Sequence, residues 1–264
     1  MKRKTRMTVT SNRCLTDGIY SMTLQYPEGE APDAVNPGQF AGIYTGNPAM
    51  LLPRPISICE WAPACRTLRF VFRVAGAGTA ELAAMKEGSR TDMLGVLGNG
   101  YDLSALADRK VLLLGGGIGI PPMVGLAEAL HDLPGTEVTA AMGYRDNNLF
   151  LTEELTACSR LLIATEDGSV GTSGNVLDAV RENAIEADVV CACGPMPMLR
   201  AVAGYAKEKG IPAYISLEER MACGVGACLG CVTRTREVDA HSHVRNARIC
   251  TEGPVFRAEE VEIG

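Results

Sequence analysis

Apolar and polar residues alternate in short runs through the first hundred residues, which is the period-of-two pattern of strands with one buried face. The clearest runs are GIYSMTLQ at 18–25, QFAGIY at 39–44 and TLRFVFRV at 67–74. Proline and glycine residues separate these runs. Several short strands at this spacing predict a small antiparallel β-barrel over residues 1–105.

The pattern changes over residues 106–212, where continuous apolar runs alternate with stretches of helical period. Apolar runs without alternation are typical of strands covered on both faces, and strands that alternate with helices predict a parallel sheet. The expected strands are 111–114, 138–142, 160–165 and 188–192, and the expected helices are 122–131, 175–183 and 196–209. A last apolar run at 213–217 leads into a short third domain, 213–264, which is rich in glycine and cysteine. The fold class is therefore all-β plus α/β.

Composition and charge exclude several kinds of protein. Hydrophobic residues make up 47% of the 264 residues and charged residues 21%, as in ordinary globular proteins. The net charge of −6 argues against a nucleic-acid partner. No run approaches the roughly 18–20 apolar residues of a membrane-spanning helix. The basic residues Lys2–Arg6 are expected to be a solvated chain end rather than a leader, and we expect a cytoplasmic protein with no membrane partner.

The cysteines are distributed unevenly along the chain. A cytoplasmic protein keeps its thiols reduced, so the ten cysteines are not expected to form disulfides. Six are scattered, whereas Cys223, Cys228 and Cys231 lie within nine residues and Cys250 follows after eighteen intervening residues. This C-x4-C-x2-C…C spacing is the plant-type pattern for a [2Fe–2S] cluster.

The residues between the clustered cysteines are nearly all small, so the loop can curl around an inorganic core and aim N–H groups at its sulfurs. Structural zinc is the competing interpretation, although zinc sites more often use two paired C-x2-C knuckles. Buried thiols without a ligand are a third interpretation, but they do not account for the spacing.

Two motifs in the first segment suggest an anion site. The tetrapeptide RPIS provides an arginine that can pair with a phosphate and a serine that can bond a ring edge, at Arg54, Pro55, Ile56 and Ser57. Further on, Gly78 and Thr79 precede a helical stretch, 80–85, whose free N–H groups would attract a pyrophosphate. A glycine-rich turn before an ordinary helix is the plain alternative.

A glycine turn ends the first strand of the second segment, in the sequence VLLLGGGIG that is followed by Ile120 and two prolines. The dinucleotide fingerprint G-x-G-x-x-G fails here, because Ile120 stands at the third glycine. What remains is a turn at the carboxyl edge of a sheet, where ligands bind; its candidate residues are Gly115, Gly116, Gly117 and Gly119. A second turn at Cys193, Gly194 and Pro195 would face the same crevice, unless Cys193 is a plain strand-end cysteine.

Together these motifs resemble the ferredoxin–NADP reductase superfamily. The cysteine-rich segment SLEERMACGVGACLGC at 216–231 narrows the resemblance to the electron-transfer subunits of class 1B dihydroorotate dehydrogenase, an enzyme of pyrimidine biosynthesis. The likeness runs nearly end to end. It implies an FAD-binding barrel, an NAD-binding domain and a [2Fe–2S] domain. It also implies that the cluster ligands are Cys223, Cys228, Cys231 and Cys250, and that FAD contacts lie at Arg54–Ser57, at Val71, Phe72 and Arg73, and at Gly78 and Thr79.

The resemblance implies a direction for the electrons as well. They would come from FMN in a separate catalytic subunit, in a heterotetramer of two plus two subunits, cross the cluster to FAD, and leave as hydride to NAD+. A flavin can join one-electron and two-electron carriers. Ser57 and Cys193 are the candidates for shaping the hydride contact, and Arg145 could meet a 2′-phosphate or face solvent.

Two other functions stay open at this stage. A subunit of an NAD(P)-linked ferredoxin or sulfide oxidoreductase would have the same domain order, but in that group an Asp stands at the position of Cys223. A zinc-stabilised nucleotide-binding regulator would have no redox chemistry.

Overall fold

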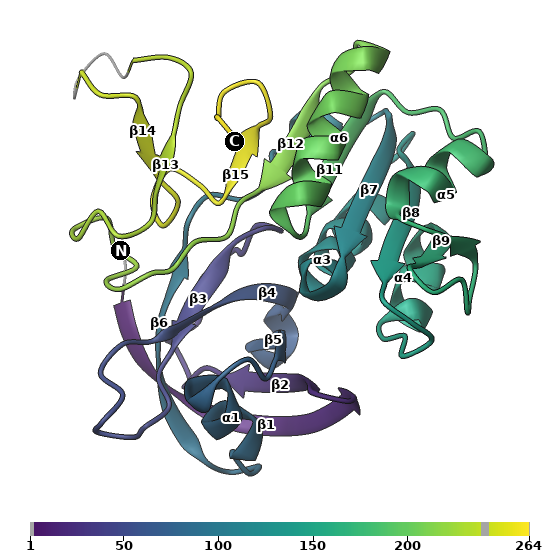
Figure 1. Cartoon of the computed structure of the whole chain (residues 1–264). Coiled ribbons are helices and arrows are strands. Elements are labelled where there is room, and N and C mark those ends of the chain that lie inside the picture. The colour runs from purple at the N-terminus through teal and green to yellow at the C-terminus, as the bar shows by residue number, and fades with distance from the viewer. Residues whose placement is uncertain (1–2, 239–242, 264) are drawn as a thin grey trace.

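The N-terminal part of the chain forms a closed antiparallel barrel. We describe a computed structural model of the chain over residues 3–238 and 243–263. The barrel order is β1-β2-β5-β4-β3-β6, and it occupies the lower part of Figure 1. Its strands are β1 (Arg3–Thr16), β2 (Ile19–Gln25), β3 (Phe40–Ile43), β4 (Arg54–Ala62), β5 (Thr67–Arg73) and β6 (Arg90–Leu97). The predicted barrel is confirmed.

The start of β1 corrects one expectation. Residues 3–6 are not a solvated chain end, because they pair with β6 in antiparallel register. Thr5 and Met7 are buried, while Lys4 and Arg6 point outward and meet Asp92 of β6 at 2.8 and 2.9 Å. The basic side chains are thus the polar half of an alternating strand. Met1 and Lys2 lie outside the described residues.

The second part of the chain is a largely parallel sheet with helices on both faces. Its order is β10-β9-β8-β7-β11-β12-β15, and only β15 runs antiparallel to its neighbour. The strands are β7 (Lys110–Gly116), β8 (Glu137–Tyr144), β9 (Arg160–Thr165), β10 (Thr172–Ser173), β11 (Val189–Cys193), β12 (Ala213–Ser216) and β15 (Val255–Arg257).

The helices include those expected and others that had no strong pattern. The expected ones are α1 (Ala77–Ala84), α3 (Ile120–His131), α5 (Val176–Glu182) and α6 (Met196–Lys209); the others are α2 (Leu103–Leu106), α4 (Thr152–Cys158) and the 3-10 turns Pro63–Cys65 and Gly117–Gly119. Two core clusters show how the helices cover the sheet. Val111 and Leu113 of β7 share a core with α3 and α4, whereas Leu112 and Leu114 share one with α5 and α6.

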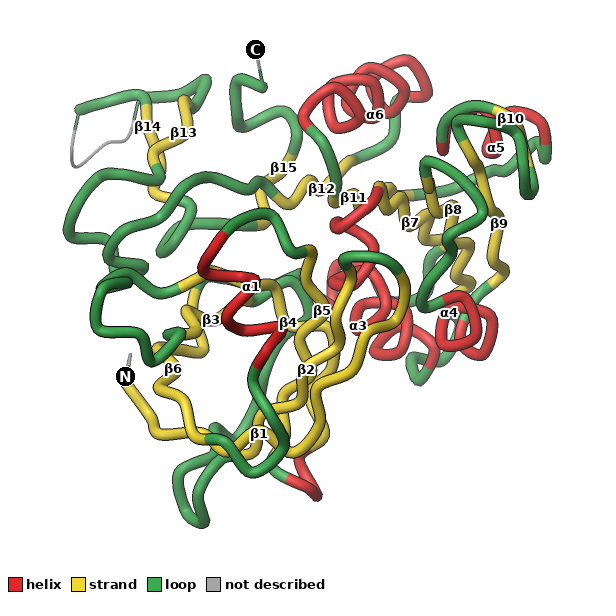
Figure 2. The backbone as a smooth tube through the Cα atoms, turned by 60° about the horizontal axis from the view of Figure 1, so that its bottom comes forward, coloured by secondary structure: helices red, strands yellow, loops and turns green. Residues whose placement is uncertain are grey.

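The barrel packs directly against the α3 side of the sheet. Buried Cys59 of β4 lies in the same core as α3, and a Cβ on Gly125 of α3 would stand 2.4 Å from the Cys59 carbonyl oxygen. Arg69 of β5 also crosses the junction, to Glu154 of α4 at 3.0 Å. Figure 2, turned with the barrel forward, shows α3 directly behind the barrel strands.

The third part of the chain leaves the sheet after β12 and returns to it at β15. Between them lies a glycine-rich loop and a short hairpin, β13 (Val232–Arg234) and β14 (Asn246–Arg248), at the upper left of Figure 1. Ile215 of β12 pairs with Phe256 of β15. The segment is therefore anchored by two adjacent strands at one edge of the sheet.

Candidate functional site: a cysteine loop and two adjoining cavities

The loop after β12 brings the clustered cysteines together. The amides of Val225 and Ala227 donate to the Cys223 sulfur at 3.4 and 3.3 Å. The bond from Val225 is the largest influence on Cys223 and helps to lower the pKa of its thiol to about 6. Amide donors directed at this sulfur stabilise the thiolate of Cys223, the form that binds metal.

The four sulfurs form two pairs. Cys228 acts on the Cys223 thiol and lowers its pKa, and Cys231 acts on the Cys250 thiol and raises its pKa. Cys231 and Cys250 are 3% and 1% exposed, and burial raises the pKa of Cys250 to about 11. Within residues 3–238 and 243–263, no three His, Cys, Asp or Glu side chains converge tightly enough to hold a single metal ion. Two thiol pairs instead fit a two-iron cluster, in which each iron takes two cysteines.

Two glycines set the shape of this loop. Gly224 has φ +66° and Gly226 has φ +88°, a region that L side chains rarely adopt. A Cβ on Gly224 would stand 3.2 Å from Leu97 of β6, and one on Gly226 would stand 2.8 Å from Thr251. The loop therefore packs closely against both the barrel and the residue that follows Cys250.

A cavity of about 300 Å³ lies where the barrel, the sheet and the cysteine segment meet. Six of the residues expected to contact flavin line it, namely Pro55, Ile56, Ser57, Val71, Phe72 and Arg73. Sequence reasoning missed the opposite walls, which come from Phe40, Ala75, Ile118 and Pro254 and from the stretch between β12 and Cys223: Ser216, Leu217, Glu218, Glu219 and Met221.

Arg54, Gly78 and Thr79 lie together outside that cavity, at the start of α1. A Cβ on Gly78 would stand 2.9 Å from the Arg54 side chain. Arg54 donates to the Leu52 carbonyl oxygen at 2.8 Å, while its buried Nε has no partner among the described residues. The Thr79 hydroxyl accepts from the amides of Ala75 and Gly76 at 2.9 and 3.2 Å. An unpaired guanidinium N–H beside a helix N-terminus fits a phosphate group.

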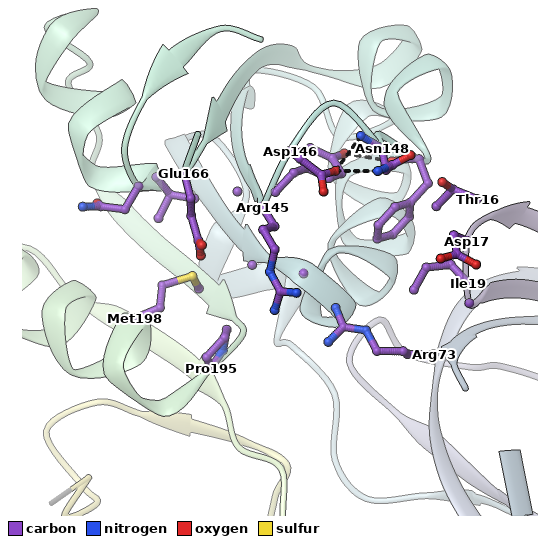
Figure 3. Close-up of a pocket in the computed structure, with 18 of the residues that line it drawn as sticks. Thr16, Asp17, Ile19, Arg73, Arg145, Asp146, Asn148, Glu166, Pro195 and Met198 are labelled. Carbon is purple, nitrogen blue, oxygen red and sulfur yellow. Dashed lines mark hydrogen bonds between the residues drawn. The ribbon is translucent and has the colours of Figure 1, made fainter. Parts of the chain in front are cut away.

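A second cavity, of about 550 Å³, opens at the carboxyl edge of the sheet. Of the candidate turn residues, Gly116, Gly117 and Pro195 line it. Arg145, which the sequence offered either for a 2′-phosphate or for solvent, lines this cavity. Sequence reasoning missed the rest of the polar lining, which comes from the ends of β8 and β9 and from the β1–β2 turn (Figure 3): Asp146, Asn148, Glu166, Thr16 and Asp17. Their position just after the parallel strands β8 and β9 was the signal that could have found Asp146, Asn148 and Glu166.

The other turn glycines have a packing role. A Cβ on Gly119 would stand 2.3 Å from the Cys193 carbonyl oxygen, and one on Gly115 would stand 2.5 Å from the Met142 sulfur. Gly194 is similarly close to Met198. Gly119 therefore lets the two turns approach each other closely, while Gly115 makes room for Met142 of β8.

Cys193 lies behind the cavity wall rather than on it. Its side chain is 0% exposed within the hydrophobic core, and burial raises the pKa of its thiol. It contacts Ser216, which lines the smaller cavity. The structure thus does not point Cys193 into the crevice as the sequence suggested.

Arg73 belongs to both cavities. A Cβ on Gly117 would stand 3.2 Å from its Nη2, so the guanidinium lies over the glycine turn. In the smaller cavity, burial raises the pKa of the Glu218 carboxyl and the Arg73 charge opposes that rise. The two cavities therefore adjoin at one cationic side chain.

Comparison with known proteins agrees with this arrangement. The chain is 39% identical over 263 residues to the dihydroorotate dehydrogenase B (NAD(+)) electron transfer subunit of Listeria innocua, covering 98% of this chain and 99% of that one. It is 42% identical over 260 residues to the corresponding subunit of Geobacillus kaustophilus, covering 97% of each. The chain belongs to this family of electron transfer subunits.

Two domain models match parts of the chain. The iron-sulfur cluster binding domain of dihydroorotate dehydrogenase B matches residues 218–262, which include all four clustered cysteines. The oxidoreductase NAD-binding domain matches residues 113–204, which include the glycine turns of the larger cavity. The presence of an iron–sulfur domain rules against the zinc interpretation.

Among solved structures, the fold is similar to that of an NADH-dependent reduced ferredoxin-NADP oxidoreductase studied for flavin-based electron bifurcation. The TM-score is 0.85 with 28% identity, covering 97% of this chain and 89% of that one. A ferredoxin reductase of carbazole 1,9a-dioxygenase is similar in fold, with a TM-score of 0.69 and 20% identity, covering 81% of this chain and 69% of that one. Of the helices in the described ranges, none has the length and apolar character needed to span a membrane.

Proposed function

We propose that this chain carries electrons from the FMN of a dihydroorotate-oxidising catalytic subunit, through a [2Fe–2S] cluster and FAD, to NAD+. The observation that carries the proposal is the placement of three sites in a row. The cysteine loop adjoins the smaller cavity, and the smaller cavity adjoins the larger one at Arg73. A flavin, when bound, exchanges single electrons with a cluster and hydride with a nicotinamide.

The cysteine loop suits the entry point for electrons. Cys228 is exposed, and the neighbouring Leu229 is 64% exposed. Val225 of the same loop is 37% exposed, and these two apolar side chains beside two accessible thiols support docking of a partner at this face. On the inner side, Met221 lines the flavin cavity two residues before Cys223. We therefore assign the outer face to the catalytic subunit, in a heterotetramer of two plus two subunits.

The barrel residues would hold FAD in two places. Arg54, with its unpaired Nε, and the α1 N-terminus at Gly78 and Thr79 would bind the pyrophosphate. Pro55, Ile56, Ser57 and the strand Val71–Phe72–Arg73 would surround the ring system in the 300 Å³ cavity. These assignments divide the chain into an FAD-binding part at 1–105, an NAD-binding part at 106–212 and a cluster part at 213–264.

Ser57 and Cys193 would help to position the flavin and the nicotinamide for hydride transfer and would not themselves react. Ser57 lines the flavin cavity and can donate a hydrogen bond at a ring edge. Cys193 supports Ser216 from behind and so acts indirectly. We expect Cys193→Ala to lower the rate of NADH-to-dye electron transfer several-fold without loss of FAD; an unchanged rate in stopped-flow mixing would remove Cys193 from the site.

NAD+ would bind in the 550 Å³ crevice, with Gly116, Gly117 and Pro195 near its phosphates. Glu166, at the end of β9, points into this crevice (Figure 3). A carboxylate there favours a ribose with a free 2′-hydroxyl over a 2′-phosphate. This supports NAD over NADP, despite the nearby Arg145.

The thiol inventory favours a reducing compartment. All ten cysteines are free, and Cys14, Cys65 and Cys228 are exposed. Such thiols persist where the surroundings are reducing, so we place the protein in the cytoplasm.

An optical and magnetic test decides the function. The full chain, purified without oxygen, should show flavin bands and a reddish absorbance that dithionite bleaches, with a paramagnetic signal after reduction. Mixed with its catalytic subunit, it should reduce NAD+ when dihydroorotate is added. A colourless protein that binds zinc, or a coloured one that responds to ferredoxin but not to the dihydroorotate-oxidising subunit, would contradict the proposal.

A further inference from the structure

A buried hydroxyl beside the cysteine loop has no partner. Thr251 follows Cys250, and its Oγ1 is buried without a hydrogen bond among the described residues. The side chain lies against Gly226, in the middle of the loop: a Cβ added there would be 2.8 Å from the threonine methyl carbon and 3.4 Å from Oγ1. A buried hydroxyl left unpaired destabilises the fold, so such a group calls for a hydrogen-bond partner.

The cationic side chain of Arg248 forms a hydrogen bond to the same loop at the protein surface. Arg248 donates from Nη1 to the Gly226 carbonyl oxygen at 3.2 Å and from Nε to Glu252 at 2.9 Å. The sulfurs of Cys250 and Cys231 lie within Coulomb range of its charge. The Thr251 amide in turn donates to the Arg248 carbonyl oxygen at 3.0 Å. Arg248 and Thr251 thus belong to one turn that lies next to Cys231 and Cys250.

The amide donors of the loop are already directed at sulfur. Val225 and Ala227 donate to Cys223, and Gly226 donates to Cys250. The Thr251 hydroxyl is the remaining donor at this place that is buried and unsatisfied.

We propose that Thr251 and Arg248 are positioning residues that raise the reduction potential of the cluster, Thr251 by donating its hydroxyl proton to a cluster sulfur and Arg248 by its positive charge. This inference rests on the proposed function, because it requires the cluster. Reduction adds one electron to a centre that already carries four thiolates. Hydrogen-bond donors and a nearby cation stabilise the added negative charge, so both groups favour the reduced state.

The test is a redox titration of the full chain with FAD and cluster bound, followed by electron paramagnetic resonance. Thr251→Val removes the hydroxyl at nearly constant shape, and Thr251→Ser keeps it. Arg248→Gln removes the charge but keeps a donor for Gly226, and Arg248→Lys keeps the charge. Glu252→Gln removes the carboxylate that offsets Arg248.

Thr251→Val and Arg248→Gln should each shift the cluster midpoint to a more negative potential. Thr251→Ser and Arg248→Lys should stay near the wild type, and Glu252→Gln should shift the midpoint to a more positive potential. The FAD midpoint, measured in the same samples, should not move. The Arg248→Gln shift should shrink as salt rises, because an exposed charge is screened.

Wild-type midpoints in both Thr251→Val and Arg248→Gln would overturn the inference. If Thr251→Val fails to retain a cluster, the cluster midpoints of Arg248→Gln and Glu252→Gln decide the question, because these substitutions alter side chains at the surface. Midpoint shifts of the same sign in both variants, or no shift in either, would overturn the inference. A wild-type chain that shows no cluster signal at all would instead contradict the proposed function, so the two failures are distinguishable.

Discussion

Glu128 of α3 occupies a charged junction between the barrel and the sheet, and its removal should stabilise the protein in a pH-dependent way. Arg69 is already paired with Glu154 at 3.0 Å and with Glu60 at 3.6 Å. Burial, followed by repulsion from Glu60, raises the pKa of the Glu128 carboxyl from 4.5 to about 7, and Arg69 only partly opposes this. The charged groups that act on Glu128 are Glu60, Arg69, Glu154 and Asp132.

The direction of the effect follows from linkage. Below pH 4.5 the carboxyl is protonated in both the folded and the unfolded chain, so it costs the fold nothing. As the pH rises toward 7 the unfolded chain releases its proton first, and above 7 the folded state carries the full cost of a buried, repelled charge. The rise from 4.5 to about 7 corresponds to ~3 kcal/mol at 1.36 kcal/mol per pKa unit. Because the side chain is partly exposed, solvent screening reduces this to roughly 1–2 kcal/mol.

Glu128→Gln keeps the shape of the side chain and removes its charge. We expect the free energy of unfolding to rise by roughly 1–2 kcal/mol at pH 8 and by only a few tenths of a kcal/mol at pH 4.5, where half of the unfolded chains are still protonated at this carboxyl. Urea unfolding at the two pH values measures this through the midpoint concentration. Glu87→Gln, at an exposed carboxylate in a loop, is the control and should change neither value. An equal gain at both pH values would refute the reasoning, because a packing effect does not depend on ionisation.

Three further predictions concern the sites. Gly226→Ala should lower cluster content severalfold, measured as iron and sulfide per chain, because φ is +88° and a Cβ would stand 2.8 Å from Thr251; Gly204→Ala, in α6 with open space around it, is the control and should not. Arg54→Gln should weaken FAD binding about 10- to 100-fold in a fluorescence titration, the loss of a charge-assisted phosphate contact; unchanged affinity would contradict the pyrophosphate assignment. Arg145→Gln should raise the Kd for NADH about tenfold with unchanged FAD content; an unchanged Kd would place Arg145 outside the nucleotide site.

Local patterns in the sequence were enough to predict the architecture. Period-two alternation indicated the barrel, and continuous apolar runs indicated the sheet, because each pattern reflects how many faces of a strand are buried. The exception was the start of β1, where Lys4 and Arg6 looked like a solvated terminus. Their role depends on Asp92, which is distant in sequence and becomes a neighbour only when the barrel closes.

The site was predictable in the parts that rest on sequence spacing and not in those that rest on tertiary contact. The cysteine loop and RPIS could be found because their residues are consecutive or nearly so. The lining by Thr16, Asp17 and Phe40 could not, since these residues belong to the barrel and reach the cavities only when the barrel packs against the sheet. Cys193 shows the converse: its position at the end of β11 suggested an active-site side chain, yet the core around it buries the thiol.

The pairing of β12 with β15 limits the distance by which the cysteine loop can move away from the flavin cavity. Six residues separate Ser216 from Cys223, so their Cα atoms, seven steps apart along the chain, can never be more than about 25 Å apart, even in a fully stretched chain. The segment from Cys250 to Val255 is shorter still, and its two end Cα atoms can be at most about 18 Å apart. Both connecting segments start from neighbouring strands of one sheet. An electron carrier mounted in this way cannot swing between distant donors and acceptors as a domain on a single flexible linker does. Its partner must therefore come to it.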